Sequence, residues 1–325
     1  MKSLKILAAT VPLAFAATAA LADGETIAVF TKNQTNPYFQ TVRVGAEAAA
    51  KSLNAKVVNY IPTKPDSIPE QLSQIEDVIV KKPSAIVFIP VDYKAMVPGV
   101  EQINEAKIPV VNVTDRSAGG KFLAFVGADD YSLGLETGRY LLKEMGGKGN
   151  VVILEGVKGS LTNIDRVRGF NDAIKENKDV KLLATQPANY QRLQGLQVME
   201  NLMQSHPQID GVLAANDAMA IGAIEALDGA NRKAKVVGIN GTKEAVDAIK
   251  AGKLLASGDY NGFLQGCIGT MVAIRAIRNE KIVSEVVLKP TVVNSSNYQP
   301  YDVPLESRAC PTWAEAAAME TPKKN

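Results

Sequence analysis

The polar side chains most able to do chemistry are spread along the chain in small groups, each just after a short apolar run. They are Asn36, Tyr38, Phe39, Asp115, Arg116, Asn216 and Asn240. A carboxylate accepts hydrogen bonds, a guanidinium donates them through a planar fork, and a side-chain amide does both. Together these groups match a polyhydroxylated molecule, whose C–H faces the aromatic rings could cover.

Few groups in the sequence are suited to catalysis or to metal binding. The chain has two cysteines and one histidine, too few for a zinc cluster, and His206 precedes Pro207, where a helix should end. No G-x-S-x-G, H-E-x-x-H or phosphate-loop motif occurs. We therefore expect no enzyme activity, no metal and no cofactor. One alternative stays open, because Asp115 and Asp217 could form a carboxylate pair of the glycosidase kind.

The elements that must position these side chains alternate in a regular order. Val- and Ile-rich runs are followed by turns and then by stretches with helical spacing, as at Leu72, Ile75, Val78 and Ile79. Apolar runs without alternation are typical of parallel strands covered by helices on both faces. The order restarts after residue 130, so we predict an α/β fold with two doubly wound parallel-sheet lobes. Ligands of such sheets bind outside the carboxyl ends of the strands.

The pattern gives expected boundaries for each element. Strands are expected at residues 26–30, 55–60, 85–89, 108–113, 122–126, 150–154, 180–185, 211–215 and 234–239. Helices are expected at residues 39–53, 68–81, 94–106, 133–145, 166–176, 193–204, 218–227, 244–251 and 263–278. A final extended stretch is expected at 286–293.

Residues 1–22 have the three parts of a secretory signal peptide: a positive start, an apolar stretch and a small-residue cleavage site at residues 20–22. The alternative is a membrane anchor, which the many alanines and Pro12 disfavour. The chain has 36 basic and 34 acidic side chains, and the peptide contains two lysines and no acid, so the mature chain carries 34 of each sign. We expect a periplasmic protein that does not bind nucleic acid.

Export makes Cys267 and Cys310 candidate disulfide partners, because thiols outside the cytoplasm are readily oxidised. Cys267 also lies on an apolar helical stripe, where a small buried side chain would serve equally well. The sequence alone leaves both interpretations open.

Six segments carry a resemblance to a known family. They are Thr35-Asn36-Pro37-Tyr38-Phe39, Thr114-Asp115-Arg116, Arg166 to Phe170 (RVRGF), Gln186-Pro187-Ala188-Asn189-Tyr190, Asn216-Asp217-Ala218-Met219-Ala220 and Val236 to Thr242 (VVGINGT). In this order, behind an export signal, they make the mature chain to about residue 293 resemble the periplasmic ribose-binding protein family, type I solute-binding proteins of ATP-binding-cassette importers. The resemblance implies two lobes joined by a three-segment hinge, with a sugar held between them.

The resemblance also implies domain boundaries. After the signal peptide at 1–22, the N-terminal lobe would comprise 23–127 with 261–288, and the C-terminal lobe 128–260 with 289–293. The tail at 294–325 has no counterpart in the short ribose binder. We hypothesise that this tail packs along one lobe, where Cys310 could tie it to Cys267.

Individual contacts in the first lobe follow from the same resemblance. Asn36 matches a hydroxyl contact of the first loop, and Tyr38 and Phe39 match an aromatic pair that packs on one side of the sugar ring. Asp115 matches a carboxylate that accepts from two hydroxyls. Arg116 matches a guanidinium that donates to a hydroxyl or to the ring oxygen.

Five further residues complete the expected site. Arg166 matches the family arginine, Tyr190 the aromatic on the opposite ring face, and Asn216 a side-chain amide. Asn240 stands where the ribose binder has Asp, and Tyr260 falls about where it has Gln. These departures, with Ile89 in place of an Asn, make ribose itself less expected than another pentose, a hexose or a sugar alcohol such as a tetritol or pentitol.

Each of these residues also has a structural interpretation. The aromatic residues could belong to the core, Asp115 and Arg116 could form a surface ion pair, and Asn216 could cap a helix while it also binds ligand. We treat Lys32 as a solvated or rim charge and Asp129-Asp130 as a lobe boundary.

The sequence therefore predicts a monomeric periplasmic protein that captures a monosaccharide or sugar alcohol and delivers it to the membrane permease of an ATP-binding-cassette importer. The alternative is a ligand-sensing receptor that feeds a chemoreceptor or a sensor kinase. A DNA-binding regulator with the same core would need a helix-turn-helix before the first strand, where this chain has its predicted signal peptide.

Overall fold

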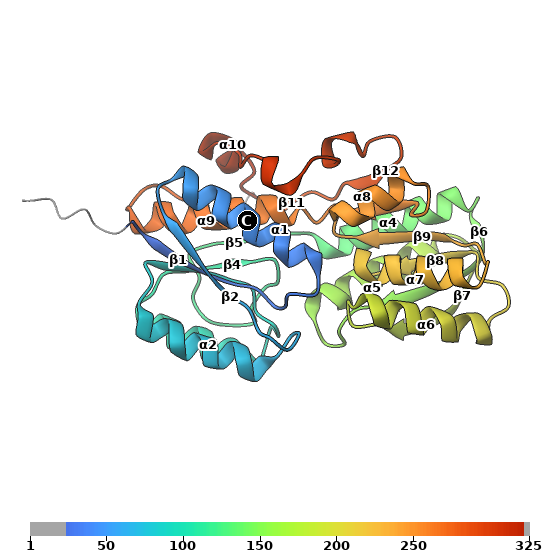
Figure 1. Cartoon of the computed structure of the whole chain (residues 1–325), viewed down its shortest axis with the longest axis horizontal. Helices are drawn as coiled ribbons and strands as arrows, with labels where there is room; N and C mark the ends of the chain where they lie inside the picture. Colours follow the sequence, from blue (N-terminus) through green and yellow to red (C-terminus); the bar gives the residue numbers. More distant parts are fainter. Residues whose placement is uncertain (1–23, 322–325) are drawn as a thin grey trace, which may run out of the picture.

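Two lobes lie side by side along the long axis of the molecule (Figure 1). The computed structural model describes residues 24–321, so the predicted signal peptide lies outside the described residues. Each lobe contains one six-stranded sheet, with strand orders β11-β5-β4-β3-β1-β2 and β12-β10-β9-β8-β6-β7. This arrangement confirms the predicted class of two doubly wound parallel-sheet lobes.

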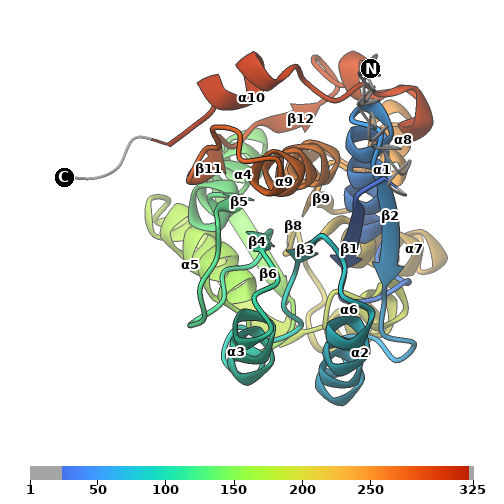
Figure 2. The same ribbon diagram turned by 90° about the vertical axis from the view of Figure 1, so that its left-hand side faces the viewer.

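The first lobe is built from parallel strands and the helices that cover them. Its elements are β1 (Thr26–Phe30), α1 (Pro37–Ser52), β2 (Lys56–Tyr60), α2 (Ile68–Lys81), β3 (Ala85–Phe88), α3 (Val97–Glu105), β4 (Val110–Val113), β5 (Phe125–Ala128), α9 (Gly262–Ile277) and β11 (Glu285–Leu288). Helices α1 and α9 cover one face of the sheet, and α2 and α3 cover the other (Figure 2). The inner strands β1, β3, β4 and β5 are buried on both faces, which explains their apolar runs, whereas the edge strand β2 is mostly exposed.

The second lobe repeats this design with one antiparallel edge strand. Its elements are α4 (Asp130–Glu144), β6 (Lys148–Glu155), α5 (Leu161–Lys175), β7 (Asp179–Pro187), α6 (Arg192–Ser205), β8 (Gly211–Ala214), α7 (Asp217–Gly229), β9 (Lys235–Ile239), α8 (Lys243–Lys250), β10 (Ala256–Gly258) and β12 (Val292–Asn294). Among the strands of residues 24–321, only β12 runs antiparallel to its neighbour, β10. The chain crosses between lobes after β5, after β10 and after β11.

Two boundaries differ from the sequence prediction in ways that affect the site. Helix α5 begins at Leu161 instead of at Arg166, because the Ser160 side chain caps it by accepting a hydrogen bond from the Asn163 N–H. The predicted extended stretch at 286–293 is divided between two lobes, as β11 and β12. The first difference brings an additional turn of helix to the interface between the lobes.

The tail crosses from the second lobe to the first, so the expectation that it packs along one lobe is wrong (Figure 1). On the second lobe, Asp302 pairs with Lys250 of α8 at 2.7 Å. After two short 3-10 turns, η1 (Gln299–Tyr301) and η2 (Leu305–Ser307), the tail reaches the first lobe. There Cys310 forms a disulfide with Cys267 of α9, their Cα atoms 5.6 Å apart. Helix α10 (Trp313–Ala318) follows.

Asp217 is a buried carboxyl that joins three elements of the second lobe. Its Oδ2 accepts hydrogen bonds from the N–H and hydroxyl of Thr242, at 2.9 and 3.1 Å, and its Oδ1 accepts from the Ser257 hydroxyl at 2.6 Å. Burial raises its pKa to about 6, although the hydrogen bonds oppose that shift. The folded protein therefore keeps this proton at a pH where the unfolded chain has lost it.

Replacing Cys310 by Ser should lower the free energy of unfolding. The disulfide joins residues 43 apart, and a link of this length typically contributes about 2 to 4 kcal/mol by restricting the unfolded chain. Urea unfolding of both proteins measures the difference. Reductant should lower the melting temperature of the wild type and leave Cys310→Ser unchanged. Equal stability of the oxidised wild type and the variant would contradict this role.

The stability of the protein should also carry a pH-dependent contribution from Asp217. A raised carboxyl pKa stabilises the fold fully below the unfolded value near 4, and the contribution disappears as pH rises through about 6. Between pH 4 and 7 the wild type should lose on the order of 3 kcal/mol more than Asp217→Asn. Urea unfolding across this range tests the sign, and identical pH slopes for the two proteins would exclude it.

Candidate ligand-binding site

A cavity lies between the lobes, where the carboxyl ends of both sheets face each other. It is lined by nine of the ten residues expected from the sequence. They are Asn36, Tyr38, Phe39, Asp115, Arg166, Tyr190, Asn216, Asn240 and Tyr260. Most of these residues follow strands, as the crevice rule for parallel sheets expects, whereas Arg166, Tyr190 and Tyr260 were expected from the family resemblance.

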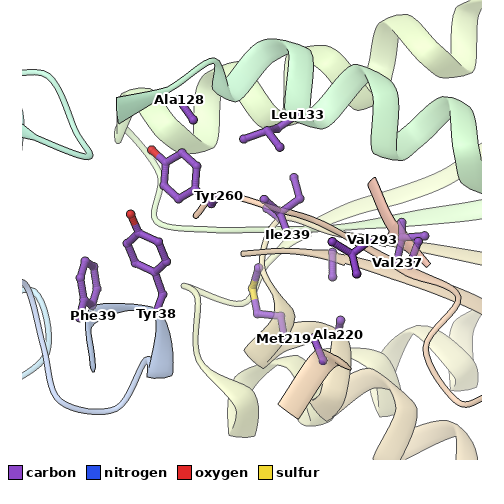
Figure 3. Packing of buried hydrophobic residues seen from close by; sticks show 14 of the residues in the cluster. Tyr38, Phe39, Ala128, Leu133, Met219, Ala220, Val237, Ile239, Tyr260 and Val293 are labelled. Carbon is purple, nitrogen blue, oxygen red and sulfur yellow. The ribbon is translucent and has the colours of Figure 1, made fainter. Parts of the chain in front are cut away.

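The aromatic wall of the cavity begins at the first turn of α1. Asn36 caps this helix, and its Oδ1 accepts a hydrogen bond from the Tyr38 N–H at 3.1 Å. The rings of Tyr38 and Phe39 meet edge to face with centroids 5.3 Å apart, and Tyr260 lies 5.1 Å from Tyr38 (Figure 3). The Tyr38 hydroxyl donates to Gln265 at 3.0 Å. These contacts hold a rigid apolar surface beside the polar groups.

Arg166 is the central cation of the second lobe. It is only 2% exposed, and its Nε donates to Asp130 at 2.8 Å while its Nη1 donates to the Ala215 carbonyl at 2.7 Å. The guanidinium also stacks on Tyr260, 4.4 Å from the ring centroid. Its Nη2 has no partner. A buried donor without an acceptor is costly, so Nη2 is suited to receive a ligand oxygen.

Three residues form the opposite wall. Asn216 caps α7 through the Met219 N–H at 3.0 Å and donates to the Tyr190 carbonyl at 3.1 Å, so its amide fixes the wall as well as lining the cavity. Asn240 accepts from Arg166 at 3.3 Å. The buried Tyr190 hydroxyl makes no hydrogen bond of good geometry, although the Ser160 side chain lies beside it. It is therefore a second unpaired polar group in the cavity.

Asp115 is held from both sides of the cavity. Its Oδ2 pairs with Lys32 at 2.8 Å, and its Oδ1 accepts a hydrogen bond from the Thr162 hydroxyl. Lys32 is only 8% exposed and lines the cavity, so its interpretation as a solvated or rim charge is wrong. Burial against Asp115 explains why a lysine is tolerated here.

Arg116 does not line the central cavity, in contrast to the expectation. Its guanidinium stacks on Phe125, 3.6 Å from the ring centroid, and pairs with Glu285 of β11. It contributes to a neighbouring cavity instead and is about half exposed. The chain bends at Thr114 and Asp115, and the contacts with Phe125 and Glu285 hold the Arg116 guanidinium away from the central cavity.

Several lining residues were missed by the sequence analysis. They are Asn33, Asp66, Val91, Thr114, Val157, Ser160 and Thr162, together with Lys32 in its new role. Most follow strands β1, β2, β3, β4 and β6, so applying the crevice rule to every strand would have found them. Ile89 is fully buried, and at this part of the wall Val91 presents an apolar side chain.

Asp115 and Asp217 do not face a common cavity, as the alternative carboxylate pair would require. Asp217 lies among Ser257 and Thr242 and does not line the cavity, whereas Asp115 does. Across residues 24–321 no cluster of three or more His, Cys, Asp or Glu side chains could hold a metal ion. In the same range, no helix has the length and apolar character needed to cross a membrane.

Comparisons with known proteins agree with this architecture. A model of the periplasmic binding protein domain matches residues 27–281. A ribose import binding protein of Haemophilus influenzae is 31% identical over 90% of this chain and 100% of that protein. A xylitol-binding protein of Mycolicibacterium smegmatis is 30% identical over 86% of this chain and 80% of that protein.

A solved structure extends the similarity to three dimensions. The periplasmic solute-binding protein of an ABC transporter from Actinobacillus succinogenes 130z, with bound D-allose, has a TM-score of 0.81 and 33% identity, and the match covers 85% of this chain and 100% of that one. The fold, the cavity between the lobes and the long sequence matches agree. The chain therefore belongs to the periplasmic binding protein domain family, as a solute-binding protein of the ribose-binding type.

Proposed function

We propose that this protein captures a small uncharged polyhydroxylated molecule, a monosaccharide or a sugar alcohol, and delivers it to the permease of an ATP-binding-cassette importer. The observation that carries the proposal is a buried cavity with an aromatic wall and two unpaired polar groups, Arg166 Nη2 and the Tyr190 hydroxyl. A ligand with several oxygens would satisfy both groups while its C–H face packs on Tyr38 and Phe39.

The charges around the cavity favour an uncharged ligand. Lys32 is paired with Asp115 at 2.8 Å, and Arg166 with Asp130 at 2.8 Å. Each of these four side chains is therefore already paired with an opposite charge. A charged ligand would have no opposite charge left to pair with. Asp66 also borders the cavity, where burial raises its pKa and so favours its neutral form.

The binding roles proposed for the individual residues follow their geometry. Asp115 and Asn240 supply acceptors, and Lys32, Arg166 and Asn36 supply donors. Tyr38, Phe39, Tyr190 and Tyr260 surround the ligand, while Asn216 holds the Tyr190 segment in place. Arg116 does not contact the ligand in this proposal, because it lies outside the central cavity.

The relatives support a range of ligands rather than one compound. Their names identify binders of ribose, xylitol and D-allose. These three ligands are a pentose, a pentitol and a hexose. Asn240, Tyr260 and Ile89 differ from the ribose-binder pattern, so a ligand other than ribose is favoured. The cycle we infer is hinge closure about the three crossings, with the closed form presented to the permease. We further infer that the mature protein acts as a monomer in the periplasm, without catalysis.

A thermal-shift screen should identify the ligand. The mature protein, residues 23–325, is tested against pentoses, hexoses, inositols and alditols of four to six carbons. A ligand at 100 times its dissociation constant adds about 2.7 kcal/mol of stability, enough to raise the melting temperature by several degrees. A shift with a carboxylated sugar acid and none with its neutral parent would contradict the proposed charge balance.

Replacing Tyr190 by Phe should weaken binding of the compound found in the screen by about three- to tenfold, because one hydrogen bond to the ligand is lost. The hydroxyl makes no hydrogen bond of good geometry within the protein, so the melting temperature of the ligand-free variant should change little. Arg116→Ala serves as the control outside the cavity, with affinity within about twofold of the wild type. Calorimetry measures both affinities. If Arg116→Ala weakens binding and Tyr190→Phe does not, Arg116 contacts the ligand and Tyr190 does not.

A further inference from the structure

One contact joins the two lobes directly at the ligand cavity. Asp115 belongs to the first lobe, just after β4, and Thr162 lies in the first turn of α5 in the second lobe. The Thr162 hydroxyl donates a hydrogen bond to Asp115 Oδ1, and both residues are less than a tenth exposed. This buried bond exists only while the lobes are together.

The first-lobe side of the contact is fixed in place. The Asp115 carbonyl accepts a hydrogen bond from the Asn112 side chain at 2.8 Å, and the Asp115 N–H donates to the Val113 carbonyl at 2.8 Å. Lys32, on the loop after β1, holds the other carboxylate oxygen at 2.8 Å. The carboxylate is therefore aimed before Thr162 arrives, and little freedom remains to be lost when the contact forms.

The second-lobe side is fixed as well. Ser160 caps α5 by accepting from the Asn163 N–H, so the helix starts early enough to place Thr162 at the cavity. Asn163 in turn donates no bond to Asp115, and its Oδ1 accepts from the Gly156 N–H at 2.6 Å. Among the described residues of this turn, Thr162 is the one that hydrogen-bonds to the first lobe.

A second contact between the lobes offers a comparison. The Thr35 hydroxyl donates to Gln191 Oε1 at 3.0 Å, but this bond is exposed at the rim and both groups are neutral. A hydrogen bond to a charged acceptor, shielded from water, contributes more than a neutral bond that water can replace. The two threonines therefore make the same kind of bond in unequal surroundings.

We propose that Thr162 is a positioning residue that stabilises the closed arrangement of the lobes through Asp115, a group that the ligand also uses. The inference deepens the proposed function and rests on it for the ligand, although the contact itself needs none. A carboxylate offers about four acceptor positions. Lys32 and Thr162 occupy one on each oxygen, which leaves one on each for ligand hydroxyls. Lobe closure and ligand binding are coupled at this single side chain.

The test compares Thr162→Val, Thr162→Ser and Thr35→Val with the wild type, all as the mature chain. Valine keeps the shape of threonine and removes the hydroxyl, serine keeps the hydroxyl, and Thr35→Val removes the matched bond at the rim. Melting temperatures establish that each variant folds. Small-angle X-ray scattering without ligand then measures how far the lobes separate.

We expect Thr162→Val to have a larger radius of gyration than the wild type, with Thr162→Ser and Thr35→Val close to the wild type. An unchanged radius for Thr162→Val, or an equal increase for Thr35→Val, would overturn the proposal. This arm requires no ligand, so its outcome stands even if the proposed function fails.

The ligand arm uses D-ribose, D-allose and xylitol as probes. For whichever probe the wild type binds, Thr162→Val should weaken affinity by about tenfold, mainly through faster dissociation, and Thr162→Ser should restore it. A loss confined to the association rate, or one that serine does not rescue, would contradict the role of Thr162. If no related sugar or alditol binds the wild type, the proposed function fails separately.

Discussion

The buried guanidinium of Arg166 is the interaction on which the site depends. It joins Asp130 at the start of α4, the end of β8 through the Ala215 carbonyl, and Asn240 after β9. It also stacks on Tyr260, whose hydroxyl donates to Asp130 at 3.0 Å beside the second crossing between the lobes. A charge this deeply buried is tolerated only with such partners, so the cavity wall and the hinge share one network.

This network makes the cavity both rigid and electrically balanced. The Tyr260 hydroxyl lies 3.2 Å from the carbonyl of Thr114, and the Thr114 hydroxyl contacts Tyr38, so the aromatic wall of the first lobe is connected to Arg166 of the second. Within each of the two ion pairs the charges balance, and other polar atoms of the cavity stay free. A site organised in this way loses little conformational freedom when an uncharged ligand binds.

The class of the fold was predictable because it depends on local patterns. Helix α2 was predicted at 68–81, the range that it occupies, because its apolar spacing lies within the segment. The structure adds the cap, since the Ser67 side chain accepts a hydrogen bond from the Glu70 N–H. Strand β10 was missed because three residues carry too little pattern. The split of residues 286–293 between two sheets depends on partners far away in the chain, which a local pattern does not contain.

The sequence by itself determined the alternation of strands and helices, the ring of polar residues after the strands, and the family, because each is written in residue type and order. Only the tertiary structure decided which way each side chain points and which residues it contacts. It turned Arg116 onto Phe125 and away from the cavity, buried Lys32 against Asp115, and carried the tail to both lobes. The physical reason is that burial and pairing of a charge depend on side chains from distant segments, which meet only when the lobes pack together.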